Sequence, residues 1–271
     1  EQAVQAALKA QKEWEKVGIE KKSQILIKIG DELIAKSKEL GELLSREEGK
    51  PLAEGIGEVA RAGQQFQYYG SECLRLYGER IPSTRPGFQV EISREPLGVI
   101  GIISPWNFPI AIPAWKAAPA MMCGNAVILK PASLTPASAI ELTKIIANQD
   151  IPDGLFNLVL GSGGDIGNKI ATHKDIVAIS FTGSVDVGRK LYQDASPFLK
   201  KMQMEMGSKN PLVVMEDADL KTAIACAANG AYGGTGQKCT ASSRLIVHEN
   251  LYDDFIKGLI DNIKNLKVGH A

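Results

Sequence analysis

The chain has 271 residues, of which 44% are hydrophobic, so it can bury a substantial core and exceeds one typical domain without requiring two full ones. Its 31 basic and 31 acidic residues balance, which gives no broad attraction to nucleic acid or an anionic membrane. No apolar run reaches the ~20 residues that span a bilayer, so we expect neither nucleic acid nor membrane as a partner.

The N-terminus and the cysteines indicate a cytoplasmic protein. Residues 1–4 have neither the basic nor the apolar segment of a signal peptide, and without an initiator Met we expect residues to be missing upstream. The four cysteines are far apart in the sequence and form no Cys-x-x-Cys motif, and no histidine lies near them. They are Cys73, Cys123, Cys226 and Cys239. We therefore expect free thiols, no metal site and no Cys–His catalytic pair.

The first part of the chain is predicted to be helical. Apolar residues recur at helical spacing, as at Ile25, Ile29 and Leu33, with Lys and Glu between them. The expected helices span residues 3–17, 21–47 and 52–77. Residues 78–95 then contain prolines and an alternating stretch at 88–92, which predicts a hairpin-like excursion.

After Pro96 the chain alternates between short apolar runs and helices. The expected strands are 97–103, 126–129, 155–160, 176–181, 201–206 and 211–214. The helices between them begin near Ala111, Thr135, Asp165, Val185 and Asp219. This order predicts an α/β fold with a doubly wound parallel sheet, similar to a Rossmann cofactor domain.

Ligands bind at the carboxyl ends of the strands in such a sheet, so the turns that follow the strands are candidate binding segments. These turns are 104–108, 130–134, 161–164 and 182–184. Beyond Gly207 a second α/β module begins, with a strand near 244–248 and a helix near 252–266. We expect this second module to be incomplete.

Two glycine-containing turns each join a strand to a helix. The turn Gly161-Ser-Gly-Gly-Asp-Ile-Gly167 allows close approach of a phosphate to the backbone and to free helix N–H groups. It does not match G-x-G-x-x-G, and it is also typical of an ordinary strand–helix turn. In the turn Phe181-Thr-Gly-Ser184, the Ser184 hydroxyl has two interpretations, a pyrophosphate ligand or only a helix N-cap.

Three further side chains carry chemical interest. Lys130, at the end of a strand, either contacts ribose or phosphate or is a solvated charge. Glu205 lies in an otherwise apolar run, where a desolvated carboxylate could act as a base, unless it is on the exposed face of an edge strand. Cys239 lies in a polar, glycine-preceded turn and could form a thiolate, whereas the other three cysteines fit buried, apolar positions.

Read together, the motifs resemble those of the aldehyde dehydrogenase superfamily. The resemblance extends from about residue 3 to residue 268, with five segments in the family's order and spacing. They are Pro105-Trp-Asn-Phe-Pro109, Lys130-Pro-Ala-Ser133, Phe181-Thr-Gly-Ser184, Glu205-Met-Gly-Ser-Lys-Asn-Pro211 and Gly236-Gln-Lys-Cys-Thr240. Joint occurrence makes a chance match negligible.

The resemblance implies a catalytic role for four residues. Cys239 corresponds to the nucleophile that forms a thiohemiacetal and then a thioester, and Asn107 to the oxyanion residue. Glu205 corresponds to the general base for hydrolysis, and Lys116 to a position linked to proton relay. The implied activity is NAD(P)-dependent oxidation of an aldehyde to a carboxylic acid.

The resemblance also implies cofactor contacts and a domain organisation. Cofactor-binding positions, for NAD or NADP, are Trp106, Asn107, Lys130, Ser133, Gly161, Gly183, Ser184 and Met206. The implied domains are an NAD(P)-binding domain (1–77 and 96–207), an oligomerisation hairpin (78–95) and a partial catalytic domain (208–271). The partner implied for the full-length form is a second copy of the chain, in a dimer or tetramer.

The resembling enzymes are nearly twice as long, so we expect this chain to be a fragment that is inactive alone. Residues 106–116 are most similar to 2-oxoglutarate (2,5-dioxovalerate) semialdehyde dehydrogenases. Trp115 replaces an Arg common in succinate semialdehyde dehydrogenases, which remain an alternative. Two further alternatives are an acylating, coenzyme A-dependent dehydrogenase, which Glu205 disfavours, and a non-catalytic cofactor-binding fragment. Ser133 stands where many NAD-preferring relatives carry Glu, so we expect NADP to be accepted.

Overall fold

The computed structural model describes residues 1–269; the final two residues, the end of the expected 208–271 domain, lie outside the described part. Four helices come first: α1 (Gln2–Glu15), α2 (Ile19–Ala35), α3 (Ser37–Glu48) and α4 (Leu52–Cys73). Their apolar stripes face inward, so that Ile25, Ile29 and Leu33 are almost fully buried. The indole N–H of Trp14 donates to the backbone oxygen of Met121 at 2.8 Å, which ties α1 to the following domain.

The single helix expected over 21–47 is wrong: α2 and α3 are separate helices. Lys36 between them has φ −91° and ψ 8°, outside the helical region, so the chain changes direction there. Because of this break, Leu33 on α2 and both Leu40 and Leu44 on α3 are buried in the core. The third helix also ends earlier than expected, at Cys73, because Leu74 and Tyr77 find no core to pack against and are exposed.

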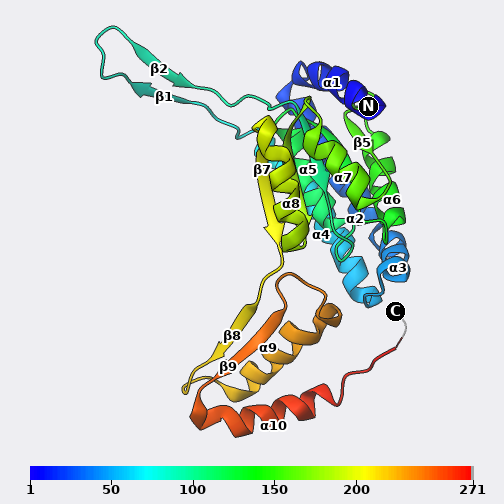
Figure 1. The fold of residues 1–271 in the computed structure, drawn as a ribbon, viewed down its shortest axis with the longest axis vertical. Helices are drawn as coiled ribbons and strands as arrows, with labels where there is room; N and C mark the ends of the chain where they lie inside the picture. Colours follow the sequence, from blue (N-terminus) through cyan, green and yellow to red (C-terminus); the bar gives the residue numbers. More distant parts are fainter. Residues whose placement is uncertain (270–271) are drawn as a thin grey trace.

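The excursion after α4 is an antiparallel hairpin of β1 (Glu79–Pro82) and β2 (Gln89–Ile92). It extends away from the rest of the molecule, at the upper left of Figure 1. Every residue of the two strands is exposed, including the apolar Ile81, Val90 and Ile92.

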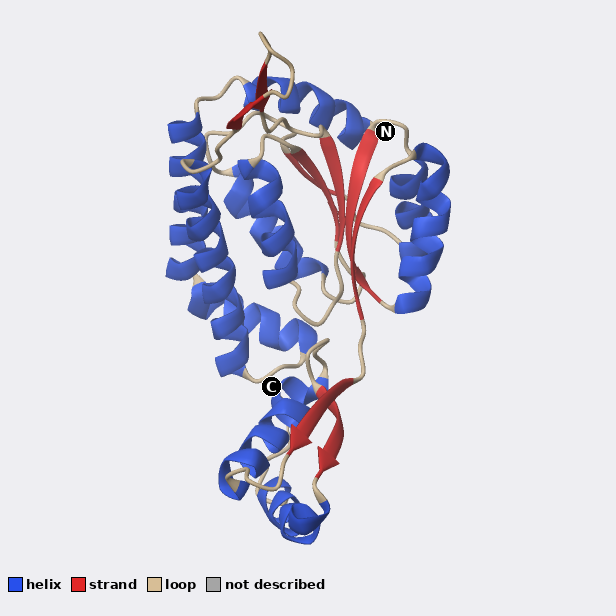
Figure 2. Ribbon diagram, turned by 90° about the vertical axis from the view of Figure 1, so that its left-hand side faces the viewer, coloured by secondary structure: helices blue, strands red, loops and turns tan. Residues whose placement is uncertain are grey.

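The central element is a parallel sheet of five strands in the order β5-β4-β3-β6-β7. The strands are β3 (Val99–Ile103), β4 (Ala126–Lys130), β5 (Phe156–Leu158), β6 (Ile176–Gly183) and β7 (Lys201–Met206). The connecting helices are α5 (Ala111–Met122), α6 (Pro136–Ala147), α7 (Gly163–Thr172) and α8 (Val185–Ala195), with the 3₁₀ turn η1 (Ser196–Phe198) after α8. Helices cover both faces of the sheet (Figure 2), which confirms the predicted α/β, doubly wound, Rossmann-like class.

Strand order fixes where a ligand can enter. From β3 the chain winds outward through β4 to β5, then returns to place β6 on the other side of β3. The switch point therefore lies between β3 and β6, where the loops after the two strands diverge and leave a crevice. Both central strands β3 and β4 are buried at every residue, whereas β7 at the edge is largely exposed.

A smaller unit follows β7. It contains the parallel pair β8 (Asn210–Val214) and β9 (Ser242–Val247), with α9 (Leu220–Tyr232), η2 (Gly233–Gly236), η3 (Glu249–Leu251) and α10 (Tyr252–Ile263). It has its own hydrophobic cluster, separate from the core around the five-stranded sheet. We call residues 1–206 the large module and residues 208–269 the small module. Within residues 1–269, no helix combines the length and apolar character that crossing a membrane requires.

Candidate active site

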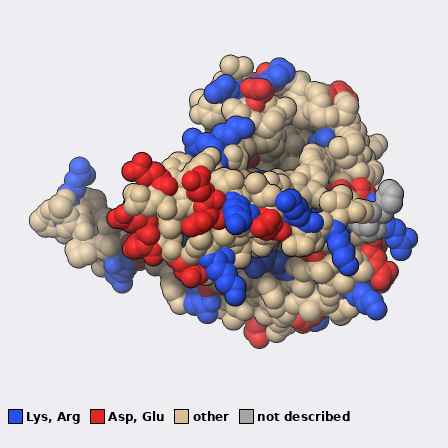
Figure 3. All heavy atoms as spheres, turned by 90° about the horizontal axis from the view of Figure 1, so that it is seen from below, with Lys and Arg blue, Asp and Glu red and all other residues tan. Residues whose placement is uncertain are grey.

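A cavity of about 650 Å³ opens beside the switch point of the sheet. Its wall combines the turns after β3, β4 and β6 with the end of β7 and one turn of the small module. The residues that line it include Ser104, Pro105, Trp106, Asn107, Lys130, Ser133, Leu134, Gly163, Thr182, Gly183, Ser184, Met206, Gly207, Gln237, Lys238 and Cys239. The turns predicted to form a ligand edge therefore meet in one cavity, because parallel strands end at the same edge of the sheet. In the view from the small-module end, the surface is hollowed and carries charges of both signs (Figure 3).

A second cavity of about 430 Å³ adjoins the first, between α7 and α8. The two share the residues Ile103, Gly163, Phe181 and Val187. Gly163, Gly164 and Gly167 line it, and a Cβ added at any of them would meet no atom within 4 Å. The glycine-rich turn thus presents bare backbone to open space, although Gly161 itself lies off both walls.

Cys239 is the only cysteine on the wall of the main cavity as formed by residues 1–269, and its side chain is exposed. The turn before it has an unusual backbone, since Gly234, Thr235 and Gly236 have φ values of 58°, 57° and 72°. A positive φ at a β-branched residue such as Thr235 is strained and requires support from neighbours. This turn brings Cys239 of the small module to the wall of a cavity that is lined mostly by residues of the large module.

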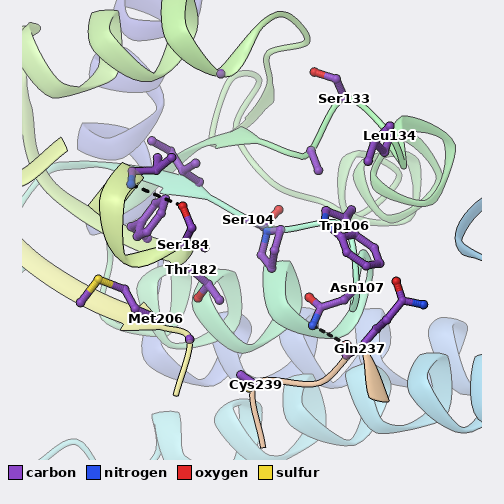
Figure 4. A pocket seen from close by; sticks show the side chains of 18 of the residues that line it. Ser104, Trp106, Asn107, Ser133, Leu134, Thr182, Ser184, Met206, Gln237 and Cys239 are labelled. Atoms are coloured by element: carbon purple, nitrogen blue, oxygen red, sulfur yellow. Dashed lines mark hydrogen bonds between the residues drawn. The ribbon is translucent and has the colours of Figure 1, made fainter. Parts of the chain in front are cut away.

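Asn107 lies on the same side of the cavity as Cys239 (Figure 4). Its side-chain Nδ2 donates to the backbone oxygen of Gln237 at 2.9 Å, two residues before Cys239. An amide nitrogen carries two N–H groups, so a second donor remains. The Oδ1 atom is buried and has no hydrogen-bond partner within the described part of the chain.

The other cysteines differ from Cys239 in position, though not always as predicted. Burial raises the pKa of the thiols of Cys73 and Cys123, which favours the protonated and unreactive form. Cys226, expected to be a buried apolar residue, is exposed on α9. The expectation is wrong because the neighbouring Ala227 and Ala228 face the small core and turn Cys226 outward.

Glu205 is also more exposed than its sequence context predicts. Apolar and polar residues alternate along β7, which is an edge strand. Glu205 is on the polar face, so its carboxylate points away from the core. It accepts a hydrogen bond from Gln203 Nε2 at 2.9 Å and does not line the cavity, whereas Met206 and Gly207 do. The Glu205 carboxylate is therefore exposed and not desolvated as expected, so the alternative of an exposed face on an edge strand holds.

Lys116, on α5, lies beneath the same edge. Its Nζ donates to Ser180 Oγ at 2.7 Å and to Gln203 Oε1 at 2.9 Å. Burial lowers the pKa of Lys116 to about 8, against the attraction of the Glu205 carboxylate, which favours the ammonium form. Gln203 contacts both side chains, so Lys116 and Glu205 share one polar cluster.

Lys130 is buried, not solvated as a lone lysine would be. Only 4% of it is exposed, and its Nζ donates to the backbone oxygen of Pro131 at 2.8 Å. Desolvation lowers the pKa of its ammonium group. The neighbouring Ser133 is exposed and donates from Oγ to the backbone oxygen of Gly161 at 3.2 Å, which joins the turns after β4 and β5.

Two serines cap the helices that begin at the cavities. Ser184 Oγ accepts from the N–H of Val187 at 3.4 Å, and Ser162 Oγ accepts from Asp165 at 3.2 Å. The N-cap interpretation of Ser184 therefore holds, and the same residue lines the cavity. Ser104, Thr182 and Gln237 also line it. From the sequence they had no assigned role of their own and were included only as members of the candidate turns or motifs.

The fold and the cavity define an α/β protein of the dinucleotide-binding kind, with a cysteine at the ligand edge of its sheet. The family model described as "Aldehyde dehydrogenase family" matches residues 1–271. This chain belongs to the aldehyde dehydrogenase family.

Individual relatives agree with that assignment. The chain is 42% identical to the alpha-ketoglutarate semialdehyde dehydrogenase of Haloferax volcanii over 267 residues, which is 98% of this chain and 55% of the relative. The solved structure of an E. coli NADP dependent enzyme superposes with a TM-score of 0.97 at 34% identity, over 99% of this chain and 56% of that one. A betaine aldehyde dehydrogenase of Staphylococcus aureus in complex with NAD+ gives 0.96 at 32% identity, with 99% and 55% covered. The chain thus spans about half the length of the relatives it matches.

Proposed function

We propose that the full-length protein oxidises an aldehyde to a carboxylic acid with NAD or NADP, with Cys239 as the covalent nucleophile. The observation that carries the proposal is the meeting of Cys239 and Asn107 in one cavity at the switch point of the sheet. The two residues come from different modules and lie far apart in the sequence. A shared position beside a crevice suited to a dinucleotide supports a joint catalytic role.

In this mechanism the Cys239 thiolate adds to the carbonyl carbon of the aldehyde, and the carbonyl oxygen becomes negatively charged. Asn107 and the backbone N–H of Cys239 donate hydrogen bonds to that oxygen. The Asn107 N–H that is not bonded to Gln237 is available for this purpose. A bound nicotinamide supplies the hydride acceptor, and a thioester on Cys239 remains.

Glu205 is the proposed base for hydrolysis of the thioester. Its carboxylate takes a proton from water, the hydroxide attacks the acyl carbon, and the Cys239 sulfur leaves as thiolate. Glu205 directly precedes Met206 and Gly207, which line the cavity, and the proposed role requires its carboxylate to turn from Gln203 toward Cys239 before hydrolysis. Lys116, with its lowered pKa and its contact with Gln203, is the proposed partner for proton relay.

The residues of the two adjoining cavities fit a nicotinamide dinucleotide. Two helix N-termini, those of α7 and α8, open at the cavities, and the bare glycine backbone there admits a diphosphate. The buried Lys130 adds positive charge, which suits an anionic ligand. The proposed cofactor contacts are Trp106, Asn107, Lys130, Ser133, Gly161, Gly183, Ser184 and Met206. Because Ser133 carries no charge, we propose that NADP is used either by preference or alongside NAD.

The proposed substrate is a semialdehyde, that is, an aldehyde carrying a carboxylate. The support is the name of the Haloferax volcanii relative, an alpha-ketoglutarate semialdehyde dehydrogenase. Trp115 is 39% exposed and stacks on Phe108 with 6.5 Å between ring centroids, which gives an aromatic surface beside the Asn107 segment.

We further propose that residues 1–77 and 96–207 form the cofactor domain and that 208–271 belong to the catalytic domain. The hairpin of 78–95 is proposed to mediate assembly into a dimer or tetramer, because its exposed apolar residues need a covering partner. We assign the protein to the cytoplasm, where reducing conditions keep Cys239 a free thiol.

Steady-state assays of the full-length protein test the proposal. A panel of semialdehydes and simple aldehydes is oxidised with NAD or NADP, with and without coenzyme A. Formation of the free acid without coenzyme A, and its loss in Cys239→Ser, supports the hydrolytic mechanism. Activity that requires coenzyme A would identify an acylating enzyme instead.

A further inference from the structure

The start of α4 carries three charged residues that the proposed chemistry leaves without a role. Lys50 lies just before the helix, and Glu54 and Glu58 lie one turn apart on it. Their side chains contact two segments far away in the sequence: the turn after β3 that contains Asn107, and the turn that contains Cys239.

Lys50 and Glu58 form a buried ion pair. Each residue is no more than 5% exposed, and Lys50 Nζ lies 2.6 Å from Glu58 Oε2. The same ammonium donates to the backbone oxygen of Asn107 at 2.7 Å, and Glu58 Oε1 accepts from the N–H groups of Ile110 and Ala111, both at 3.0 Å. One ion pair therefore holds three backbone atoms of the segment 107–111.

A buried ion pair of this kind contributes geometry more readily than stability. Removing two charges from water is costly, and apolar side chains of similar volume often stabilise a protein as well or better. What such side chains cannot do is bond to the backbone oxygen of Asn107 and the N–H groups at the start of α5. Lys50 Nζ also lies 4.0 Å from the ring centroid of Phe108, a cation–π contact that further restricts this segment.

Glu54 contacts the other turn. Its Oε1 accepts from the N–H of Gly234 at 2.9 Å, and its Oε2 lies 3.8 Å from Lys238 Nζ. Gly234 is the first of the residues with positive φ before Cys239, and it precedes the strained Thr235. A strained turn persists only where its neighbours fix it, and Glu54 is such a neighbour.

These contacts also join the modules. Among residues 1–269, the hydrogen bonds and ion pairs between the large and small modules are Asn107 to Gln237, Gly234 to Glu54 and Lys238 to Glu54. All of them depend on the start of α4 or on the segment that Lys50 and Glu58 hold. The polar connection between the two halves of the candidate site is concentrated here.

We propose that Lys50, Glu54 and Glu58 are positioning residues that fix Asn107 relative to Cys239, and so set the geometry of the oxyanion site. They contact no reacting atom and act through the two backbone segments. The inference rests on the proposed function, because it assigns Asn107 and Cys239 their catalytic parts. A displacement of about 1 Å in such a site reduces rates by up to about 100-fold.

The first test is the double variant Lys50→Met/Glu58→Gln of the full-length protein, which removes both charges and leaves neither one unpaired. We expect the pre-steady-state burst of reduced cofactor to slow by about 10- to 100-fold. The dissociation constant for the cofactor should change less, because most of its proposed contacts lie on other segments. Asn107→Ala should slow the burst by itself, and in that background the double variant should add nothing. The matched control is Lys144→Met/Glu141→Gln, an exposed ion pair of 2.7 Å on α6, which should retain the wild-type burst.

Glu54 gives a second test on a side chain that is partly exposed, so folding is not at risk. Glu54→Gln keeps an oxygen that can accept from Gly234, whereas Glu54→Ala does not. We expect the burst to slow by about tenfold in Glu54→Ala, which loses the acceptor for the Gly234 N–H, and to remain near wild type in Glu54→Gln.

The outcomes separate the two levels of inference. If the Lys50/Glu58 variant slows the burst equally with and without the Asn107 amide, or if Glu54→Ala and Glu54→Gln behave alike, the positioning role is wrong. If Asn107→Ala and Cys239→Ser themselves leave the burst unchanged, the proposed function is wrong, whatever the other variants do.

Discussion

The two modules differ in how firmly they are built. The large module has one continuous hydrophobic core around β3 and β4, and every residue of these two strands is buried. The small module buries only Val214, Ala227, Ala228, Phe255 and Leu259 in its own cluster. Its strands leave apolar residues uncovered, with Val213 57% and Ile246 52% exposed.

This difference bears on the chemistry. The cofactor-binding candidates lie on the large module, whose core fixes the turns at the sheet edge. The nucleophile candidate Cys239 lies on the small module, where a strained turn and a few polar contacts determine its position. In the proposed mechanism, cofactor binding and bond formation depend on modules with hydrophobic cores of different size, so mutations in each module should have different effects.

The largest expected effect is that of Cys239→Ser, which tests whether the small module carries the covalent step. Oxidation by the full-length protein should fall by about 10⁶-fold, as for removal of other covalent nucleophiles, while cofactor binding to the large module persists. Activity and cofactor affinity are measured by initial rates and fluorescence titration. Cys226→Ala, an exposed cysteine of the same module, is the control and should remain active; equal losses in both variants would contradict the assignment.

Glu205 lies near the junction of the modules, and its substitution separates the two halves of the reaction. Turnover of Glu205→Gln should fall by about 100- to 10,000-fold, the usual contribution of a general base, because thioester hydrolysis slows. The burst of reduced cofactor should remain, since hydride transfer precedes that step. Stopped-flow absorbance measures both phases.

The control for Glu205 is Glu216→Gln, an exposed carboxylate of the small module that lies away from the cavity. It should keep both burst and turnover. Loss of the burst in Glu205→Gln, with fold and cofactor binding intact, would mean that Glu205 acts before hydrolysis.

A smaller effect is expected from Ser133→Glu, which changes only cofactor choice on the large module. Two charges about 4 Å apart at an effective dielectric near 20 interact by about 4 kcal/mol, and exposure of Ser133 reduces this severalfold. Even about 1.4 kcal/mol is a tenfold change, so the ratio of kcat/KM for NADP to that for NAD should fall about tenfold. Ser196→Glu adds the same charge at the far end of α8 and should leave the ratio unchanged; a shift in both variants would indicate a long-range charge effect.

The large module is also the part that sequence predicts best. Short apolar strands and amphipathic helices are local patterns, so the doubly wound sheet and the ligand edge follow from periodicity and the rules of parallel sheets. The break at Lys36 was missed because the apolar spacing continues through it, and only packing of Leu33 and Leu40 into one core requires it.

Side-chain environments were harder to predict, since they depend on the position of a strand within the sheet. Lys130 is the last residue of the inner strand β4 and is buried, whereas Glu205 is on an edge strand and is exposed. Both lie in apolar segments, so the local sequence does not distinguish them. In the sequence, Lys50 and Glu58 resemble ordinary surface charges at the start of a helix, and only the structure, through the contact with Asn107, reveals their burial.

The smallest effect concerns Lys116, which tests whether the polar cluster below the sheet edge is truly sheltered. Burial lowers its pKa from 10.5 to about 8 in the folded protein. Below pH 8 both folded and unfolded chains keep the proton, so its contribution to the free energy of unfolding is constant. Above pH 8 the folded chain releases the proton while the unfolded chain retains it up to about pH 10.5, so stability rises with pH.

Lys116→Met removes this titration, so the stability of the wild type relative to the variant should increase between pH 8 and 9. One proton limits the change to at most about tenfold in the unfolding equilibrium per pH unit. Urea unfolding at pH 7, 8 and 9 measures it, with Lys9→Met as the control because that side chain is 82% exposed. In Glu205→Gln, the charge that favours the Lys116 ammonium is gone, so the rise should begin at a lower pH. A flat difference from pH 7 to 9 would mean that Lys116 is solvated, and that the large module does not shelter the edge where it meets the small one.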